Sequence, residues 1–66
     1  MKIIVNGKEL DITSSETVAN LIDRLGEGTG GIAVAVNDKL VRRNSWSSFQ
    51  LSENDSVVII KAAYGG

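Results

Sequence analysis

The first twelve residues largely alternate between apolar and polar side chains, and this alternation predicts a β-hairpin. Its centre is Asn6-Gly7, a pair favoured in two-residue type I′ turns because both turn positions need a positive φ. A turn of this length places Val5 opposite Lys8 and thereby sets the register of the whole hairpin. The apolar side chains on one face should then belong to the core: Met1, Ile3, Val5, Leu10 and Ile12.

Residues 17–25 carry apolar side chains at the spacing of an amphipathic helix. Thr17 is the expected N-cap, because its hydroxyl can accept a hydrogen bond from a free amide of the first turn. Thr13 with Glu16 spells an alternative capping box one turn earlier. Gly26 should end the helix. The apolar stripe consists of Val18, Leu21, Ile22 and Leu25, and the polar face of Asn20, Asp23 and Arg24.

A glycine-rich loop at residues 27–31 follows the helix. It lacks the lysine and the serine or threonine of a phosphate-binding P-loop and precedes a strand, so a mobile connection is the better interpretation. Residues 32–36 should form a buried strand, and the turn pair Asn37-Asp38 should lead into a short partner strand at residues 39–41. The first of these strands should direct Ile32, Val34 and Val36 toward the helix and Ala33 and Ala35 to the opposite face.

The segment after these strands shows no regular period and should be irregular or form a single helical turn. Trp46 and Phe49 are three residues apart, so both can fold back over one end of the core. Arg42 and Arg43 follow closely on Lys39 and make a small basic patch. Its simplest interpretation is a solvated loop.

Residues 57–60 are consecutive apolar residues, which favours a central strand over an edge strand. We expect this strand to run parallel to residues 2–5, with Val57 and Ile59 facing the helix. The opposite face of the sheet would then be open and carry apolar side chains. An uncovered apolar patch beside the end of the chain is a candidate docking surface for a partner protein. The residues assigned to this partner-docking face are Ile4, Val58 and Ile60.

Composition narrows the chemistry that the chain can perform. Its 66 residues suffice for one small domain, and they include neither cysteine nor histidine. A thiol nucleophile, a disulfide and the commonest general base are therefore missing, so we expect no catalytic residue and no metal site. The net charge of −1 comes from interspersed charges, which predicts no binding to nucleic acid or to anionic lipid. Without a long apolar stretch or a secretory signal, the protein should be cytoplasmic.

The last residues, Ala62-Ala63-Tyr64-Gly65-Gly66, follow the final apolar strand. We expect a domain at residues 1–61 and a flexible tail at residues 62–66. The ionised carboxylate of Gly66 could attack the α-phosphate of a nucleotide, and two glycines without side chains could enter a narrow channel. Chain ends also fray without any function, so an incidental terminus is the alternative.

Short motifs along the whole chain stand in an order typical of a known family: Asn6-Gly7, Thr17-Val18, Leu21-Ile22, Leu25, Ala35-Val36-Asn37, Val41, Arg43, Trp46, Asp55, Val57 and Gly65-Gly66. The chain resembles the ubiquitin-like β-grasp fold, an α+β fold, and more narrowly the sulfur carrier proteins of thiamine biosynthesis (the ThiS family). The resemblance implies a mixed sheet of four to five strands packed on one helix. Two positions depart from the family pattern: Arg42 stands where a proline is usual, which should loosen that loop, and Tyr64 replaces a smaller or aliphatic residue.

The resemblance also implies a reaction cycle in which the chain is not an enzyme and binds no cofactor itself. An adenylating enzyme related to ubiquitin activators would use ATP and magnesium to convert the Gly66 carboxylate to an acyl adenylate. Sulfur from a cysteine desulfurase or a related donor would displace AMP and leave a thiocarboxylate, which thiazole synthase would accept. Tyr64 and Gly65, with Ala63, would contact the channel of the partner enzyme.

Three other functions remain open at this point. The chain could carry sulfur for molybdopterin, for tRNA thiolation or for sulfur amino-acid synthesis. It could be a ubiquitin-like modifier that forms an isopeptide bond to lysine. It could also be an interaction module whose terminal glycines have no chemical role.

Overall fold

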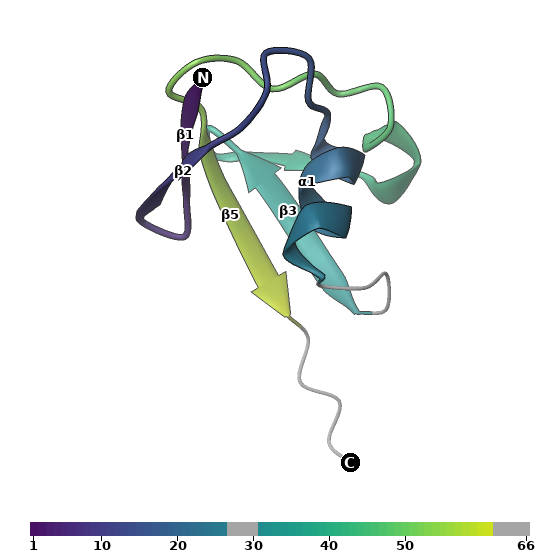
Figure 1. Ribbon diagram of the computed structural model, residues 1–66. Helices are drawn as coiled ribbons and strands as arrows, with labels where there is room; N and C mark the ends of the chain where they lie inside the picture. The colour runs from purple at the N-terminus through teal and green to yellow at the C-terminus, as the bar shows by residue number, and fades with distance from the viewer. Residues whose placement is uncertain (27–30, 62–66) are drawn as a thin grey trace.

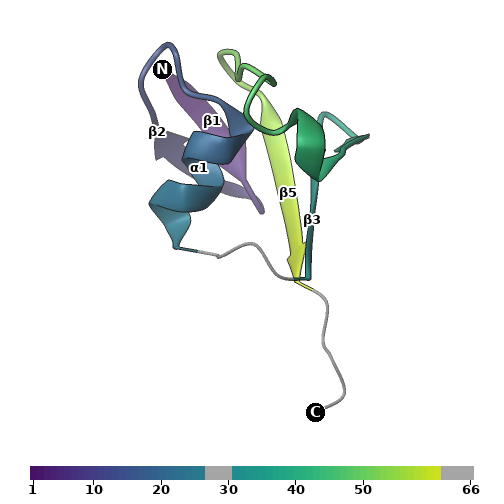
Figure 2. The same ribbon diagram turned by 90° about the vertical axis from the view of Figure 1, so that its right-hand side faces the viewer.

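The computed structural model describes residues 1–26 and 31–61 (Figure 1). Within these residues one mixed sheet of five strands has the order β2-β1-β5-β3-β4, and a helix packs against one side of it (Figure 2). The prediction of one helix on a mixed sheet of four to five strands is confirmed. The elements are β1 (Lys2–Val5), β2 (Lys8–Asp11), α1 (Val18–Leu25), β3 (Ile32–Val36), β4 (Lys39–Val41), the 3₁₀ turn η1 (Arg43–Ser45) and β5 (Ser56–Lys61).

The β1-β2 hairpin has the predicted turn and register. Asn6 and Gly7 adopt φ values of 49° and 85°, the left-handed conformations that a type I′ turn needs. Val5 lies opposite Lys8 and Ile3 opposite Leu10. Ile3 is fully buried, and the other predicted core residues of the hairpin are buried or packed against the core.

Strand β5 occupies the centre of the sheet, as predicted. It pairs parallel with β1, where Val5 lies opposite Val57, and antiparallel with β3. This placement buries Val57 and Ile59 on the side of the sheet that α1 covers. The β3-β4 turn also follows the prediction, because Asn37 and Asp38 both have a positive φ and Val34 lies opposite Val41.

Helix α1 begins after Thr17 and not one turn earlier. The Thr17 hydroxyl accepts a hydrogen bond from the Asn20 amide at 3.2 Å, and the Asn20 side chain accepts one from the Thr17 amide at 3.1 Å. This reciprocal pair is a capping box, with asparagine at the position where glutamate or glutamine is more usual. The alternative box forms only a separate turn before the helix, in which Glu16 accepts a hydrogen bond from the Thr13 amide. Gly26 ends the helix with φ 68°.

The segment between β4 and β5 covers one end of the core, as predicted for its two aromatic residues. Trp46 is buried, and its indole Nε1 donates a hydrogen bond to the Val41 carbonyl at 2.9 Å. Phe49 packs against the core as well. The carbonyls of Trp46 and Phe49 accept hydrogen bonds from the first amides of α1, at Ala19 and Val18, both at 3.0 Å. These contacts satisfy donors that a helix N-terminus leaves without an internal partner.

Arg42 keeps the backbone geometry that proline would impose at this position. Its φ is −67°, and a proline ring holds φ near −65°. The arginine therefore changes the side chain while its φ stays at a value that proline could also adopt. Arg43 contributes a contact that the basic-patch interpretation omitted, since its guanidinium lies over the Trp46 ring at 5.4 Å.

Candidate functional site

The predicted chemical site lies largely outside the described residues. Gly66, Gly65, Tyr64 and Ala63 belong to residues 62–66, and the structure describes the chain only as far as Lys61 at that end. The glycine-rich loop also lies outside them, apart from Gly31. The parts of the site that the structure does show are the strand from which the chain end departs and the open face of the sheet beside it.

Strand β5 anchors this end of the chain. It pairs with β3 over five consecutive positions, from Val57 opposite Val36 to Lys61 opposite Ile32. The pairing therefore extends to the last residue of β5. Because the strand is central and its core-facing side chains are buried, its last residue, Lys61, has a fixed position in the domain.

The open face carries the apolar patch that was predicted. Val58 is 39% exposed and Ile60 is 59% exposed, and each lies opposite a small residue of β3, Ala35 and Ala33 respectively. An alanine is too short to cover its larger neighbour. Ile4 lies on the same face of the adjacent strand and is half-buried. The three residues predicted to dock a partner thus share one face of two adjacent strands, with Ile4 beside the start of β5 and Val58 and Ile60 farther along it.

Leu40 extends this patch, and the sequence analysis missed it. Leu40 belongs to β4, lies opposite Ala35 of β3 and is 70% exposed. Its neighbour Val41 is buried, and adjacent residues of a strand point to opposite faces. Alternation within residues 39–41 could therefore have placed Leu40 on the open face. We define the open-face patch as Ile4, Leu40, Val58 and Ile60.

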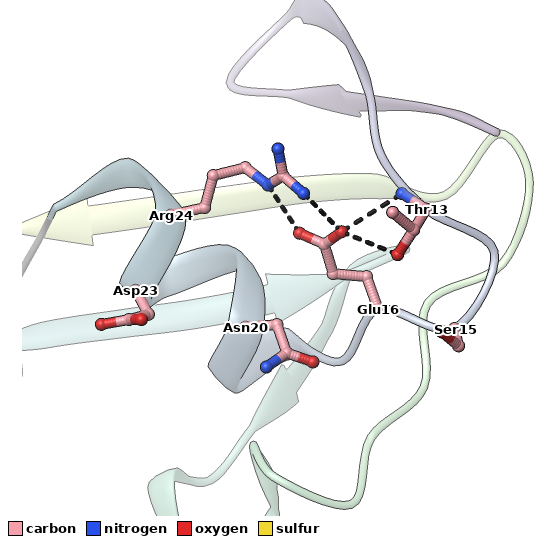
Figure 3. A pocket seen from close by; sticks show the side chains of 6 residues that line it. All are labelled: Thr13, Ser15, Glu16, Asn20, Asp23 and Arg24. Atoms are coloured by element: carbon pink, nitrogen blue, oxygen red, sulfur yellow. Dashed lines mark hydrogen bonds and ion pairs between the residues drawn. The ribbon is translucent and has the colours of Figure 1, made fainter.

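A second site that the sequence analysis missed lies beside α1 (Figure 3). Glu16 is only 4% exposed, and its carboxylate accepts hydrogen bonds from Arg24 Nε at 2.7 Å and from an Arg24 Nη at 2.8 Å. The Thr13 amide and hydroxyl donate to the same carboxylate, at 3.2 and 3.1 Å. A polar pocket surrounds this pair, lined by Thr13, Ser15, Glu16, Asn20, Asp23 and Arg24.

The Glu16–Arg24 pair has a structural role. The hydrogen bonds that Arg24 donates to Glu16 lower the pKa of Glu16 from its ordinary value of 4.5, and burial of the carboxylate opposes this shift. A carboxylate that is held ionised by four donors is a weak general base and has little capacity left for a ligand. In residues 1–26 and 31–61, acidic side chains form no cluster that could hold a metal ion. Nor does any helix of that part of the chain have the length and apolar character needed to cross a membrane.

Comparison with known proteins gives a consistent result. The family model described as the ThiS family matches residues 3–66. The sulfur carrier protein ThiS of Escherichia coli strain K12 is 26% identical over 66 residues, which cover both chains completely. A thiazole synthase of Paramagnetospirillum magneticum is 30% identical over 66 residues, which are all of this chain but 20% of that protein.

Solved structures show the same fold. The crystal structure of a thiamine biosynthesis protein (ThiS) from Geobacter metallireducens aligns with a TM-score of 0.85 at 23% identity, over the full length of both chains. A solution NMR structure of a thiamine biosynthesis protein from the same organism aligns with a TM-score of 0.81 at 25% identity, over all of this chain and 88% of the other. The β-grasp fold is thereby confirmed.

Proposed function

The chain belongs to the ThiS family and is a sulfur carrier of thiamine biosynthesis, and we propose that it carries the sulfur on the terminal carboxylate of Gly66. The observation that supports this position is the absence of cysteine from the whole sequence. No side chain can hold a persulfide, so a thiocarboxylate at the main-chain terminus is the remaining place for the sulfur. The domain at residues 1–61 would present a tail at residues 62–66.

The proposed cycle starts with a partner enzyme of the adenylating class. A carboxylate oxygen of Gly66 attacks the α-phosphorus of ATP in the presence of magnesium, and pyrophosphate leaves. A sulfur nucleophile, such as the persulfide of a cysteine desulfurase, then attacks the acyl carbon and displaces AMP. The product is an acyl disulfide with the donor cysteine. A thiol then attacks the donor's sulfur, forms a new disulfide with it and releases the thiocarboxylate on the carrier. Because the first step consumes ATP, we place the cycle in the cytoplasm.

The open-face patch is the proposed contact with the adenylating enzyme. Ile60 lies one residue before the end of β5, so a partner covering it would sit next to the point where residues 62–66 begin. The exposed side chains of Val58, Ile60 and Leu40 offer apolar area that such a partner can remove from water. Gly65, Tyr64 and Ala63 would then contact the channel that leads to the nucleotide.

Thiazole synthase is the proposed acceptor of the sulfur. A protein of that name matches this chain over a fifth of its own length. A carrier-like segment within the same polypeptide would hold donor and acceptor at a high effective concentration. This relationship supports direct transfer from the Gly66 thiocarboxylate to a thiazole synthase.

Intact mass spectrometry tests the proposal. We expect the protein to gain the mass of one exchange of oxygen for sulfur after incubation with its adenylating enzyme, ATP, magnesium and a sulfur donor. A variant that lacks Gly66 should show no gain and should melt at nearly the same temperature as the wild type, because the deletion lies outside the domain. Conjugates of higher mass would instead identify a protein modifier. An unchanged mass would refute the carrier chemistry.

A further inference from the structure

Strand β5 is longer than the strand that pairs with it on one side. Its parallel pairing with β1 covers two positions, Ile4 opposite Ser56 and Val5 opposite Val57. After Val5 the chain turns away into β2, whereas β5 continues to Lys61 (Figure 1). On the β1 side, the last part of β5 therefore extends past the end of the neighbouring strand.

The side chain of Asn6 takes the place of the missing strand. Its Oδ1 accepts a hydrogen bond from the Ile59 amide at 2.8 Å, and its Nδ2 donates to the Ile59 carbonyl at 3.4 Å. The Asn6 main-chain amide donates to the Val57 carbonyl at 2.8 Å. A carboxamide has the same donor and acceptor as a peptide group, so Asn6 continues the β1-β5 ladder for one more step.

A second turn asparagine makes a comparable contact at the opposite end of β5. Asn37 Oδ1 accepts a hydrogen bond from the Ser56 amide at 3.0 Å, and the Asn37 amide donates to the Ser56 carbonyl at 2.8 Å. Asn37 and Asn6 have similar φ values, 51° and 49°. Strand β5 is thus held at its start from the β3 side and near its end from the β1 side.

We infer that Asn6 is a positioning residue for the reaction at Gly66, an inference that rests on the proposed function. Its two side-chain hydrogen bonds hold the Ile59 peptide two residues before the end of β5. Without them, Ile59 would lose its partner on the β1 side and keep its pairing with Val34 of β3, so this part of β5 could move more freely about that strand. The chain would then leave the domain over a wider range of directions, and each encounter with the adenylating enzyme would have to restrict that range.

Glycine substitutions provide a matched test. In Asn6→Gly, the new glycine tolerates the positive φ of this turn position, and both side-chain hydrogen bonds to Ile59 are lost. Asn37→Gly places glycine in the other turn and removes the hydrogen bond that Asn37 Oδ1 accepts from the Ser56 amide and the one that its Nδ2 donates to Asp55 Oδ1. Both lie at the opposite end of β5 from Lys61. Asn6→Asp retains an acceptor for the Ile59 amide but loses the donor to the Ile59 carbonyl. Comparison of the three variants shows whether an effect comes from losing the contacts of Asn6 with Ile59 or from losing any asparagine side chain in a turn.

The measurement is carrier-dependent exchange of pyrophosphate into ATP by the adenylating enzyme, together with hydrogen exchange of the Ile59 amide. For Asn6→Gly we expect KM for the carrier to rise about five-fold, the size of the cost of ordering one flexible side chain on binding, with little change in kcat. Its Ile59 amide should exchange faster than in the wild type. Asn6→Asp should keep most of the protection at Ile59 and show an intermediate KM, and Asn37→Gly should keep the wild-type KM.

Two outcomes would refute the inference while leaving the carrier function intact. In the first, Asn6→Gly and Asn37→Gly raise KM equally, which would mean that overall stability controls the reaction. In the second, Ile59 loses its protection in Asn6→Gly but KM stays at the wild-type value. If the wild-type chain itself supports no pyrophosphate exchange, the proposed function fails and the inference fails with it.

Discussion

Ile59 and Ile60 are neighbours in β5, yet their side chains lie on opposite faces of the sheet. Ile59 is 8% exposed and faces α1, whereas Ile60 is 59% exposed and belongs to the open-face patch. Aspartate at each position in turn introduces the same charge into the same strand. Because the two sites differ mainly in burial, the pair of variants separates docking of a partner from folding of the domain.

The expected magnitudes differ widely. Ile59→Asp loses about 2 kcal/mol of apolar burial and places a carboxylate in the core, which costs several kcal/mol more. The sum approaches the whole stability of a small domain, roughly 5 kcal/mol, so this variant should be largely unfolded. Ile60 is already more than half exposed, so Ile60→Asp should cost about 1 kcal/mol or less and lower Tm by a few degrees.

Binding should show the opposite sensitivity. A partner that covers the open-face patch would lose about 1 kcal/mol of apolar contact with Ile60→Asp and would have to desolvate the new carboxylate at a further cost of about 1 to 3 kcal/mol. Together these costs correspond to a rise in Kd of about thirty-fold or more. Circular dichroism melts and isothermal titration of the adenylating enzyme measure the two effects separately.

Ser14→Asp is the matched control, because it adds the same charge at an exposed residue of the turn before α1, which is not part of the open-face patch. It should bind as the wild type does. If Ile60→Asp stays folded and binds normally, the docking surface lies elsewhere. If it unfolds as completely as Ile59→Asp, the open face contributes to the core and our description of it is wrong.

Two further predictions concern stability. Glu16 has a lowered pKa in the folded state, so its stabilising contribution is complete above its ordinary pKa of 4.5 and disappears as the pH falls through the folded value. Glu16→Gln should therefore melt below the wild type at neutral pH, and the two Tm values should converge in acid. A difference in Tm between the two proteins that does not depend on pH would contradict a stabilising role of the ionised Glu16 carboxylate. Arg42→Pro should raise Tm by a few degrees, because φ of −67° already suits the ring and proline restricts the unfolded chain by about 0.4 to 1 kcal/mol. A lower Tm would show that the Arg42 amide or side chain contributes to the fold.

The fold was predictable because its signals are local. The Asn6-Gly7 turn and the alternation beside it determine the hairpin register, and the spacing of apolar residues with Gly26 determines the helix. The position of β5 followed from its uninterrupted apolar residues, and the faces of Val58 and Ile60 from strand alternation. The patch could also have included Leu40 on the same reasoning. The roles assigned to Gly66 and the residues before it rest on chemistry and on family membership, and they stay predictions.

The polar contacts between residues far apart in the sequence were not predictable, because each joins a side chain to a group that is brought close only by the folded chain. Arg24 reaches Glu16 eight residues earlier, and Asn6 reaches Ile59 across 53 positions of sequence. The amino-acid sequence by itself determined the strands, the helix, their faces and the lack of any thiol. Tertiary structure decided which asparagines hold β5, Asn6 and Asn37, and which carboxylate pairs with an arginine. The physical reason is that burial of an apolar face depends on many side chains together, so the sequence pattern reveals it. A hydrogen bond requires two particular atoms to lie about 3 Å apart.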